Sequence, residues 1–169
     1  MCTGQHHIRR ILPVLITTIA LGLGLGLGLG LLLIAGACSA DRHADINAQL
    51  NAGGITLGMK QAAVQDKLGA ADPVPCVSGY ELLYPDAGLT IGFDNDRGTV
   101  RRVTMQTDAY DFGGITVGES VPDGVSAART AGWTPEEGFK SQLLKDDYRL
   151  ILKSIKGETI DEITIEHRL

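Results

Sequence analysis

The chain has 169 residues, with 15 Lys or Arg and 20 Asp or Glu, and its formal net charge is −5 at pH 7. This length allows one ordinary domain or two very small ones. Beyond the first ten residues, 13 bases stand against 20 acids, and that acidic excess excludes a general nucleic-acid-binding surface.

Residues 1–37 are predicted to be an export signal. A short basic start precedes the uncharged run Ile11–Ala37, which ends in small residues. The ending Ile34–Cys38 resembles the lipobox of bacterial lipoproteins, in which a diacylglyceryl group is attached to the Cys sulfur and the chain is cleaved before it. The resemblance implies lipid attachment at Cys38 and a location on the cell membrane or outer membrane, facing outside the cytoplasm.

A second interpretation of the same segment remains open. The uncharged run exceeds 20 residues, so it is long enough to span a bilayer as an uncleaved anchor. Both interpretations place the remaining residues outside the cytoplasm and attach them to a membrane.

Cysteine usage excludes an intramolecular disulfide in the exported part. Cys2 leaves with the signal and Cys38 carries lipid, so that Cys76 is the single thiol. It lies in the loop-like stretch 72–79. A small half-buried side chain is favoured over a reactive thiol, because no His is near it in the sequence to activate it.

An internal repeat organises the rest of the chain. Gly53–Gly58 recurs sixty positions later as Gly113–Gly118, with five of six residues identical. A helix is predicted after each copy, over 59–68 and over 121–131, the second with Ser120 as its N-cap. Each helix is expected to stop at a glycine.

Strand periodicity follows each predicted helix. Alternating apolar residues predict three strands in the first half, at 80–84, 89–93 and 99–105, and three in the second half, near 139–144, 148–152 and 159–166. The sequence therefore predicts an α+β fold of two tandem units, 53–112 and 113–169, each a helix with a three-stranded antiparallel meander. Residues 38–52 are expected to be a polar tether, and a partly helical tether is compatible with the sequence. Because units of this size are marginally stable alone, the two are expected to share one core.

The first unit resembles a known pattern of small bacterial lipoproteins. The residues that carry the resemblance are Gly54–Met59, Val64, Leu68–Gly69, Tyr84, Phe93–Asp94 and Val103. They are similar to the repeat of the BamE (SmpA/OmlA) family and of β-lactamase-inhibitor-protein-like domains, whose inhibitor-like members carry two units in tandem. The resemblance spans 53–167 and implies a binding or scaffolding module of the cell envelope.

Departures from that pattern limit what it implies. Lys60 stands where the pattern has Ser or Thr, and Ala131–Trp133 replaces the usual end of the second helix. Nothing matches the partner-contacting segments of either family, so neither barrel assembly nor lactamase inhibition is carried over.

The sequence shows no catalytic or metal-binding motif, and neither a cofactor nor a metal is expected. The exported part has two histidines, His43 and His167, outside any motif. Asp94–Gly98 is similar to the start of a calcium loop but lacks the acidic twelfth ligand, so a hairpin turn is favoured. Glu136–Glu137 fits a capped helical turn begun by Thr134 better than a general acid–base pair.

The candidate partner-binding residues are aromatic. Tyr and Trp are enriched in binding hot spots, and the number of these residues exceeds what a small core requires. Packing in the core with the polar tip in water is nevertheless the favoured interpretation of them. The candidates are Tyr80, Tyr84, Trp133 and Tyr148.

Three functions are compatible with these features. The leading hypothesis is a non-catalytic, membrane-anchored module that holds a protein partner on the outer face of its sheet or in the cleft between the repeats. The alternative is a carrier or sensor that binds a small ligand in that cleft. An envelope hydrolase is the third.

Overall fold

The computed structural model describes residues 42–77 and 79–168, all within one unit, Cys38–Leu169. The predicted signal and the lipidation site lie outside the described residues. The helices are α1 (Ala44–Asn47), α2 (Gln61–Leu68), the 3-10 turn η1 (Pro85–Ala87) and α3 (Val121–Thr130). In the described part of the chain, no helix has both the length and the apolarity needed to cross a membrane.

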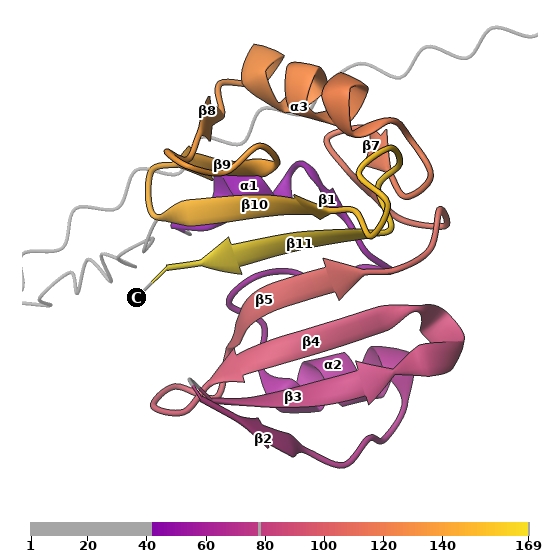
Figure 1. Cartoon of the computed structure of the whole chain (residues 1–169). Coiled ribbons are helices and arrows are strands. Elements are labelled where there is room, and N and C mark those ends of the chain that lie inside the picture. Colours follow the sequence, from indigo (N-terminus) through magenta and orange to yellow (C-terminus); the bar gives the residue numbers. More distant parts are fainter. Residues whose placement is uncertain (1–41, 78, 169) are drawn as a thin grey trace, which may run out of the picture. The chain divides into compact units, whose positions relative to one another are not determined.

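An antiparallel sheet of eight strands forms the centre of this unit, in the order β2-β3-β4-β5-β11-β10-β9-β8 (Figure 1). Its strands are β2 (Val74–Cys76), β3 (Gly79–Tyr84), β4 (Leu89–Asp94), β5 (Val100–Met105), β8 (Thr134–Pro135), β9 (Gln142–Lys145), β10 (Tyr148–Lys153) and β11 (Glu162–His167). A smaller antiparallel sheet, in the order β1-β6-β7, joins β1 (Leu50–Asn51), β6 (Asp111–Phe112) and β7 (Ile115–Thr116). The fold is therefore mixed, with short helices and mostly antiparallel strands.

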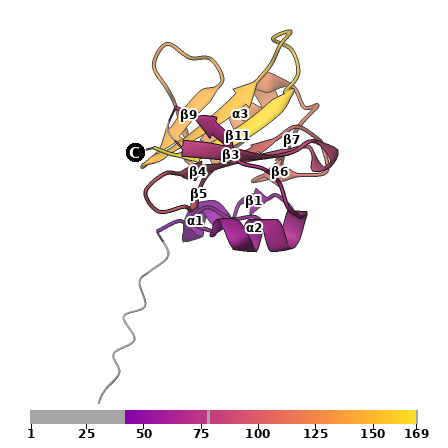
Figure 2. The same cartoon turned by 90° about the horizontal axis from the view of Figure 1, so that it is seen from below.

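The helices pack on one face of the large sheet. The Tyr80 hydroxyl donates to Gln61 Oε1 of α2 at 2.8 Å, and the Tyr84 hydroxyl donates to the Gly69 carbonyl at the end of that helix. Figure 2 shows α1, α2 and β1 on the same side of the sheet. α3 approaches the sheet at Gly124, next to Leu152. This covered face holds the apolar core.

The core follows from strand alternation, because every second side chain points toward the helices. Register brings the fully buried Ile91, Val103, Ile165 and Leu150 side by side across β4, β5, β11 and β10. One continuous apolar cluster therefore extends across both halves of the sheet.

Backbone contacts recur at a spacing of sixty residues. The Gly58 N–H donates to the Val100 carbonyl at 2.8 Å, and the Gly118 N–H donates to the Ile160 carbonyl at 2.8 Å. Where β5 meets β11, Thr104 pairs with Thr164. Gly58 and Val100 thus correspond to Gly118 and Ile160, sixty positions later. Thr104 corresponds to Thr164 in the same way, so β5 and β11 meet through corresponding positions.

The predicted helices and strands are found, with shifted ends. α3 has the expected cap, because Ser120 Oγ accepts from the Asp123 N–H at 3.2 Å. The prediction of three strands in each half is incomplete, since β2 and β8 extend the two edges of the sheet. Sequence analysis also missed the small sheet, because its two-residue strands are too short to show a period.

The described part of the segment expected to be a tether, residues 42–52, belongs to the folded unit. Residues 42–52 contain α1 and β1, and Ile46 and Ala52 are buried in the core. Asn47 further fixes the segment, because its side chain exchanges two hydrogen bonds with the backbone of Leu57. The folded unit therefore begins no later than residue 42.

The capped helical turn expected at Thr134–Glu137 is also wrong. Thr134 and Pro135 form β8, which pairs with β9, and Thr134 Oγ1 donates to the Leu144 carbonyl at 3.1 Å. The buried Trp133 fixes the chain immediately before this strand. Long-range pairing thus overrides the local capping pattern.

The segment 94–98 is the hairpin turn between β4 and β5. Asp94 Oδ2 accepts from Thr99 Oγ1 at 2.8 Å, and Oδ1 accepts from the Arg97 N–H. Burial by itself raises the pKa of Asp94, but the hydrogen bonds from Thr99 and from the backbone N–H groups of Arg97 and Gly98 outweigh burial, so the pKa is lowered. The Asp94 carboxylate therefore holds the turn together through hydrogen bonds.

Asp94→Asn is expected to destabilise the fold by about 1 kcal/mol at pH 7, because the amide binds these donors less strongly. Since folding lowers the pKa of Asp94, its stabilising effect is present above the pKa of the unfolded chain and is lost as the pH falls from about 5 toward 2. Urea unfolding at several pH values measures the difference, with the exposed Asp96→Asn as control. A difference that grows at acid pH contradicts this account.

Candidate functional site: the open face of the sheet

The face of the large sheet opposite the helices is hollowed by about 400 Å³. Outward-pointing side chains of five adjacent strands line this hollow, from β3 across β4, β5 and β11 to β10. We call this surface the open face. Its lining residues are Glu81, Leu83, Thr90, Arg102, Thr104, Gln106, Ile151, Lys153, Glu162, Thr164 and Glu166.

A row of hydroxyls crosses the middle of the open face. Thr90, Thr104 and Thr164 are direct cross-strand neighbours on β4, β5 and β11. The hydroxyls of Thr104 and Thr164 lie 2.9 Å apart and share a hydrogen bond, which joins the two halves of the sheet. The row ends in apolar side chains, Leu83 at one side and Ile151 at the other. Leu83 is 46% exposed.

One ion pair of the open face passes over a glycine. Arg102 on β5 pairs with Glu81 on β3, so its side chain crosses β4 at Gly92. A Cβ at position 92 would lie 3.2 Å from both Cβ and Nε of Arg102. The missing side chain therefore gives the guanidinium room to reach Glu81.

A second group of charges lies over β10 and β11. Arg149 contacts Glu136, with Nε 3.0 Å from Oε2, and also Glu166, with Nη1 3.1 Å from Oε1. Lys153 and Gln106 both contact Glu162, at 3.5 Å and 2.9 Å.

These pairs are half-exposed, so each contributes little to stability. Their effect is to hold donors and acceptors in fixed positions. Because Glu136 is engaged with Arg149, the described contacts support a structural role for it more than acid–base chemistry.

The exposure assumed for the aromatic candidates is wrong. Trp133 is 2% exposed, and Tyr84 and Tyr148 are also buried. Tyr80 is half-buried and stacks on Phe93 with ring centroids 5.0 Å apart. Burial raises the pKa of Tyr84 and, together with the charge of Asp94, that of Tyr80. The packing alternative describes these four residues, and they lie apart from the open face.

Cys76, His43 and His167 do not line the open face. Cys76 is half-buried in the edge strand β2. His43 and His167 come together, with ring centroids 5.3 Å apart, beside Tyr148. Across residues 42–77 and 79–168, no three His, Cys, Asp or Glu side chains are placed to hold a metal ion.

Sequence analysis named the outer face of the sheet but none of the residues that line it. A signal was present, because Glu81, Leu83, Arg102 and Thr104 occupy the alternate positions of predicted strands. Alternation along the chain does not show which strands are neighbours or which face of the sheet the helices leave open. Both depend on long-range contacts.

Comparisons with known proteins show similarity of fold only. No family model matches the chain, and no curated protein matches it. The chain is similar to the 1.5 Å crystal structure of an extracellular protein containing an SCP domain from Bacillus anthracis, with a TM-score of 0.50 and 12% sequence identity. The match covers 66% of this chain and 44% of the Bacillus protein, so this chain spans less than half of that protein's length.

Proposed function

We propose that this chain is a membrane-anchored extracytoplasmic lipoprotein, with lipid at Cys38, and that it acts as a non-catalytic module that binds a protein partner. The anchor rests on the export pattern and the lipobox-like ending. An extracytoplasmic location agrees with the extracellular protein of similar fold. The resemblance to BamE-like and inhibitor-like repeats stays a prediction.

The module consists, in this proposal, of two tandem helix-and-meander units joined through β5 and β11. The sixty-residue spacing of backbone contacts supports it, as does the sheet order, in which four strands of each half follow in mirrored sequence. Equivalent elements that meet through the same surface have the geometry of an isologous dimer interface. The proposal therefore treats the chain as a dimer-like arrangement within one polypeptide.

The observation that carries the binding proposal is the open face, which none of the helices within residues 42–77 and 79–168 covers. The two edges of the sheet are poor docking sites, because β2 contains Pro75 and β8 contains Pro135. Proline lacks the N–H needed to pair with an added strand. The partner expected on the open face is a folded protein whose surface offers hydrogen-bonding groups to the half-buried Glu81, Thr90 and Arg102. It would also make apolar contacts to Leu83 and Ile151.

Co-purification with matched variants tests this function. Leu83→Arg and Ile151→Arg place a charge at the two ends of the threonine row and are expected to weaken capture of the partner from solubilised envelope about tenfold or more. Ala127→Arg, on the exposed side of α3, is the control and is expected to retain capture. Equal loss in all three variants, or loss in the control alone, contradicts the open face as the partner surface.

The hollow itself favours the second candidate, a small-ligand carrier or sensor. Its volume is within the range of small-ligand sites, and strands of both halves line it. A thermal-shift screen of the full chain with peptides, lipids and cell-wall fragments tests this candidate. A shift that Thr104→Val removes supports it, whereas no shift with any compound class leaves the protein partner as the better account.

A further inference from the structure

The anchor and the folded unit are separated by a very short length of chain. This inference rests on the proposed membrane anchor. Cys38 and Arg42 are four residues apart, which limits their separation to about 14 Å even when the chain is fully extended. The folded unit is therefore held close to the bilayer, and the place where residue 42 attaches decides which side faces the lipid.

Contacts to Tyr148 fix that place of attachment. The Tyr148 hydroxyl donates to the Arg42 carbonyl at 2.8 Å, and His43 Nδ1 lies 2.9 Å from the same hydroxyl. His43 is buried against Tyr148 and His167. The chain therefore leaves the fold beside the start of β10 and the end of β11.

Antiparallel register divides the loops between two ends of the sheet. Tyr148 at the start of β10 pairs with His167 at the end of β11. On the next strand, β5, Arg102 pairs with Glu166, so position 101 lies in the same row as His167 and Tyr148. The β4–β5 turn and the β2–β3 turn lie at this end, which we call the proximal end. The β3–β4 turn and the β10–β11 loop lie at the other, distal end, beyond the row of Leu89, Met105, Ile163 and Leu152.

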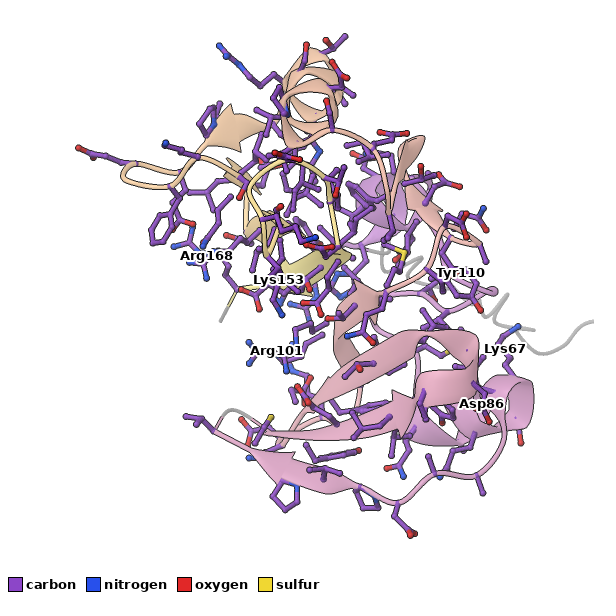
Figure 3. All side chains as sticks on the ribbon, turned by 45° about the vertical axis from the view of Figure 1, so that its right-hand side comes forward. Lys67, Asp86, Arg101, Tyr110, Lys153 and Arg168 are labelled. Atoms are coloured by element: carbon purple, nitrogen blue, oxygen red, sulfur yellow. The ribbon has the colours of Figure 1, made fainter. Side chains whose placement is uncertain are left out.

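Charge differs between the two ends, although the protein as a whole is acidic. Cations of the proximal end are Arg42, Lys60, Arg97, Arg101 and Arg168, and its acids are Asp94, Asp96, Asp146 and Asp147. Acids of the distal end are Asp86, Asp108, Glu119, Glu158 and Asp161, and its cations are Lys67 and Lys156. The formal charges of these residues sum to about +1 at the proximal end and about −3 at the distal end. Figure 3 shows Arg101 and Arg168 on one side and Asp86 and Lys67 on the other.

Residues of the proximal end contact one another across the turns. The Lys60 ammonium donates to the Arg97 carbonyl at 2.6 Å, and the Arg168 N–H donates to the Asp147 carbonyl at 2.7 Å. Burial lowers the pKa of His167, and the charges of Arg42, Arg101 and Arg97 lower it further, against the opposing effect of Asp147. In formal charge, the four proximal acids offset four of these five cations.

We infer that the proximal end is a membrane-contact surface, at which Arg42, Arg97 and Arg168 meet the head groups of anionic phospholipids while the acidic distal end points away. All three side chains are exposed. Each cation near an anionic surface favours contact roughly fivefold. This orientation leaves the strand faces, including the open face, perpendicular to the bilayer and accessible to a partner.

Lipid-dependent quenching on reconstituted full chain tests the orientation. In a Cys2→Ser, Cys76→Ser background, one fluorophore is placed at Val77→Cys, in the β2–β3 turn of the proximal end, or at Asp86→Cys, in the distal β3–β4 turn. Both positions are exposed. Vesicles contain a quencher on the lipid head group and either zwitterionic lipid alone or zwitterionic with anionic lipid. The label at 77 is expected to be quenched more than the label at 86, and more strongly in anionic vesicles.

Charge variants complete the experiment. Arg97→Gln with Arg168→Gln removes two proximal cations and is expected to shift the equilibrium away from lipid contact about 25-fold. Lys67→Gln with Lys156→Gln, the same charge change at the distal end, is expected to leave the quenching at 77 unchanged. High salt is expected to reduce the anionic effect.

Two results overturn the inference: quenching at 86 that equals or exceeds quenching at 77, or quenching at 77 that is independent of lipid charge. Failure of the chain to float with vesicles overturns the anchor itself and this inference together. Loss of partner capture in the sheet-face variants is measured separately, so the two proposals fail independently.

Discussion

Trp133→Ala is expected to lower the free energy of unfolding by about 3 to 5 kcal/mol. Trp133 is 2% exposed and packs edge-to-face on Phe112 of the small sheet, with ring centroids 5.6 Å apart. Its backbone N–H donates to the Ala128 carbonyl and so closes α3. Removal of the ring leaves a cavity between α3 and the small sheet. Urea unfolding followed by circular dichroism measures the loss.

Trp133→Phe is the matched control. It keeps an aromatic ring at the site, so the expected loss is about 1.5 kcal/mol or less. If Trp133→Ala abolishes partner capture without any loss of stability, the residue belongs to a binding surface, and its assignment to the core is wrong.

Gly124→Leu is expected to cost about 3 kcal/mol or more, because α3 lies against the sheet at this residue. A Cβ at position 124 would lie 2.7 Å from Ile160 Cδ1 and 3.1 Å from Leu152 Cδ1. Ile160 and Leu152 are themselves buried, so their methyl groups have little space to move. The residue sixty positions earlier, in α2, is the buried Val64. The glycine in α3 allows this helix to lie closer to the sheet than a valine there would.

Ser126→Leu on the exposed side of α3 controls for helix propensity and is expected to change stability by about 0.5 kcal/mol or less. Thermal unfolding of both variants gives the comparison. Equal effects of the two substitutions would mean that α3 does not pack through Gly124.

Local patterns predicted most of the large sheet. Alternation in Tyr80, Leu82 and Tyr84 places β3, and Ser120 with Asp123 places the start of α3. These signals are local because a strand or a helix cap repeats its chemistry within a few residues. The pairing of β5 with β11 joins residues sixty positions apart, and no local pattern specifies it.

The burial of residues 42–52 is not predicted from the sequence because their apolar positions are sparse. Ile46, Leu50 and Ala52 are separated mostly by polar residues, and α1 has only four residues. A four-residue helix is too short to show amphipathic periodicity. These residues are buried because neighbouring segments close over them, which only the tertiary structure reveals.

Three of the aromatic candidates are buried because the core is larger than a single predicted unit would require. A meander covered by one helix has little room for Tyr84, Tyr148 and Trp133, but the joined sheet and the small sheet enclose all three. The open face was predicted only as a location. Its ion pairs depend on register, since Glu81 and Arg102 are neighbours only across the glycine on β4.

Site-specific photo-cross-linking in living cells tests the open face most directly. A photo-reactive amino acid at position 83 or 151 on the open face is expected to give the same protein adduct, whereas position 127 on α3 gives none. All three are compared at equal expression in the anchored chain. An adduct from position 127 without one from 83 and 151 would show that the partner binds the helical side and would contradict the account.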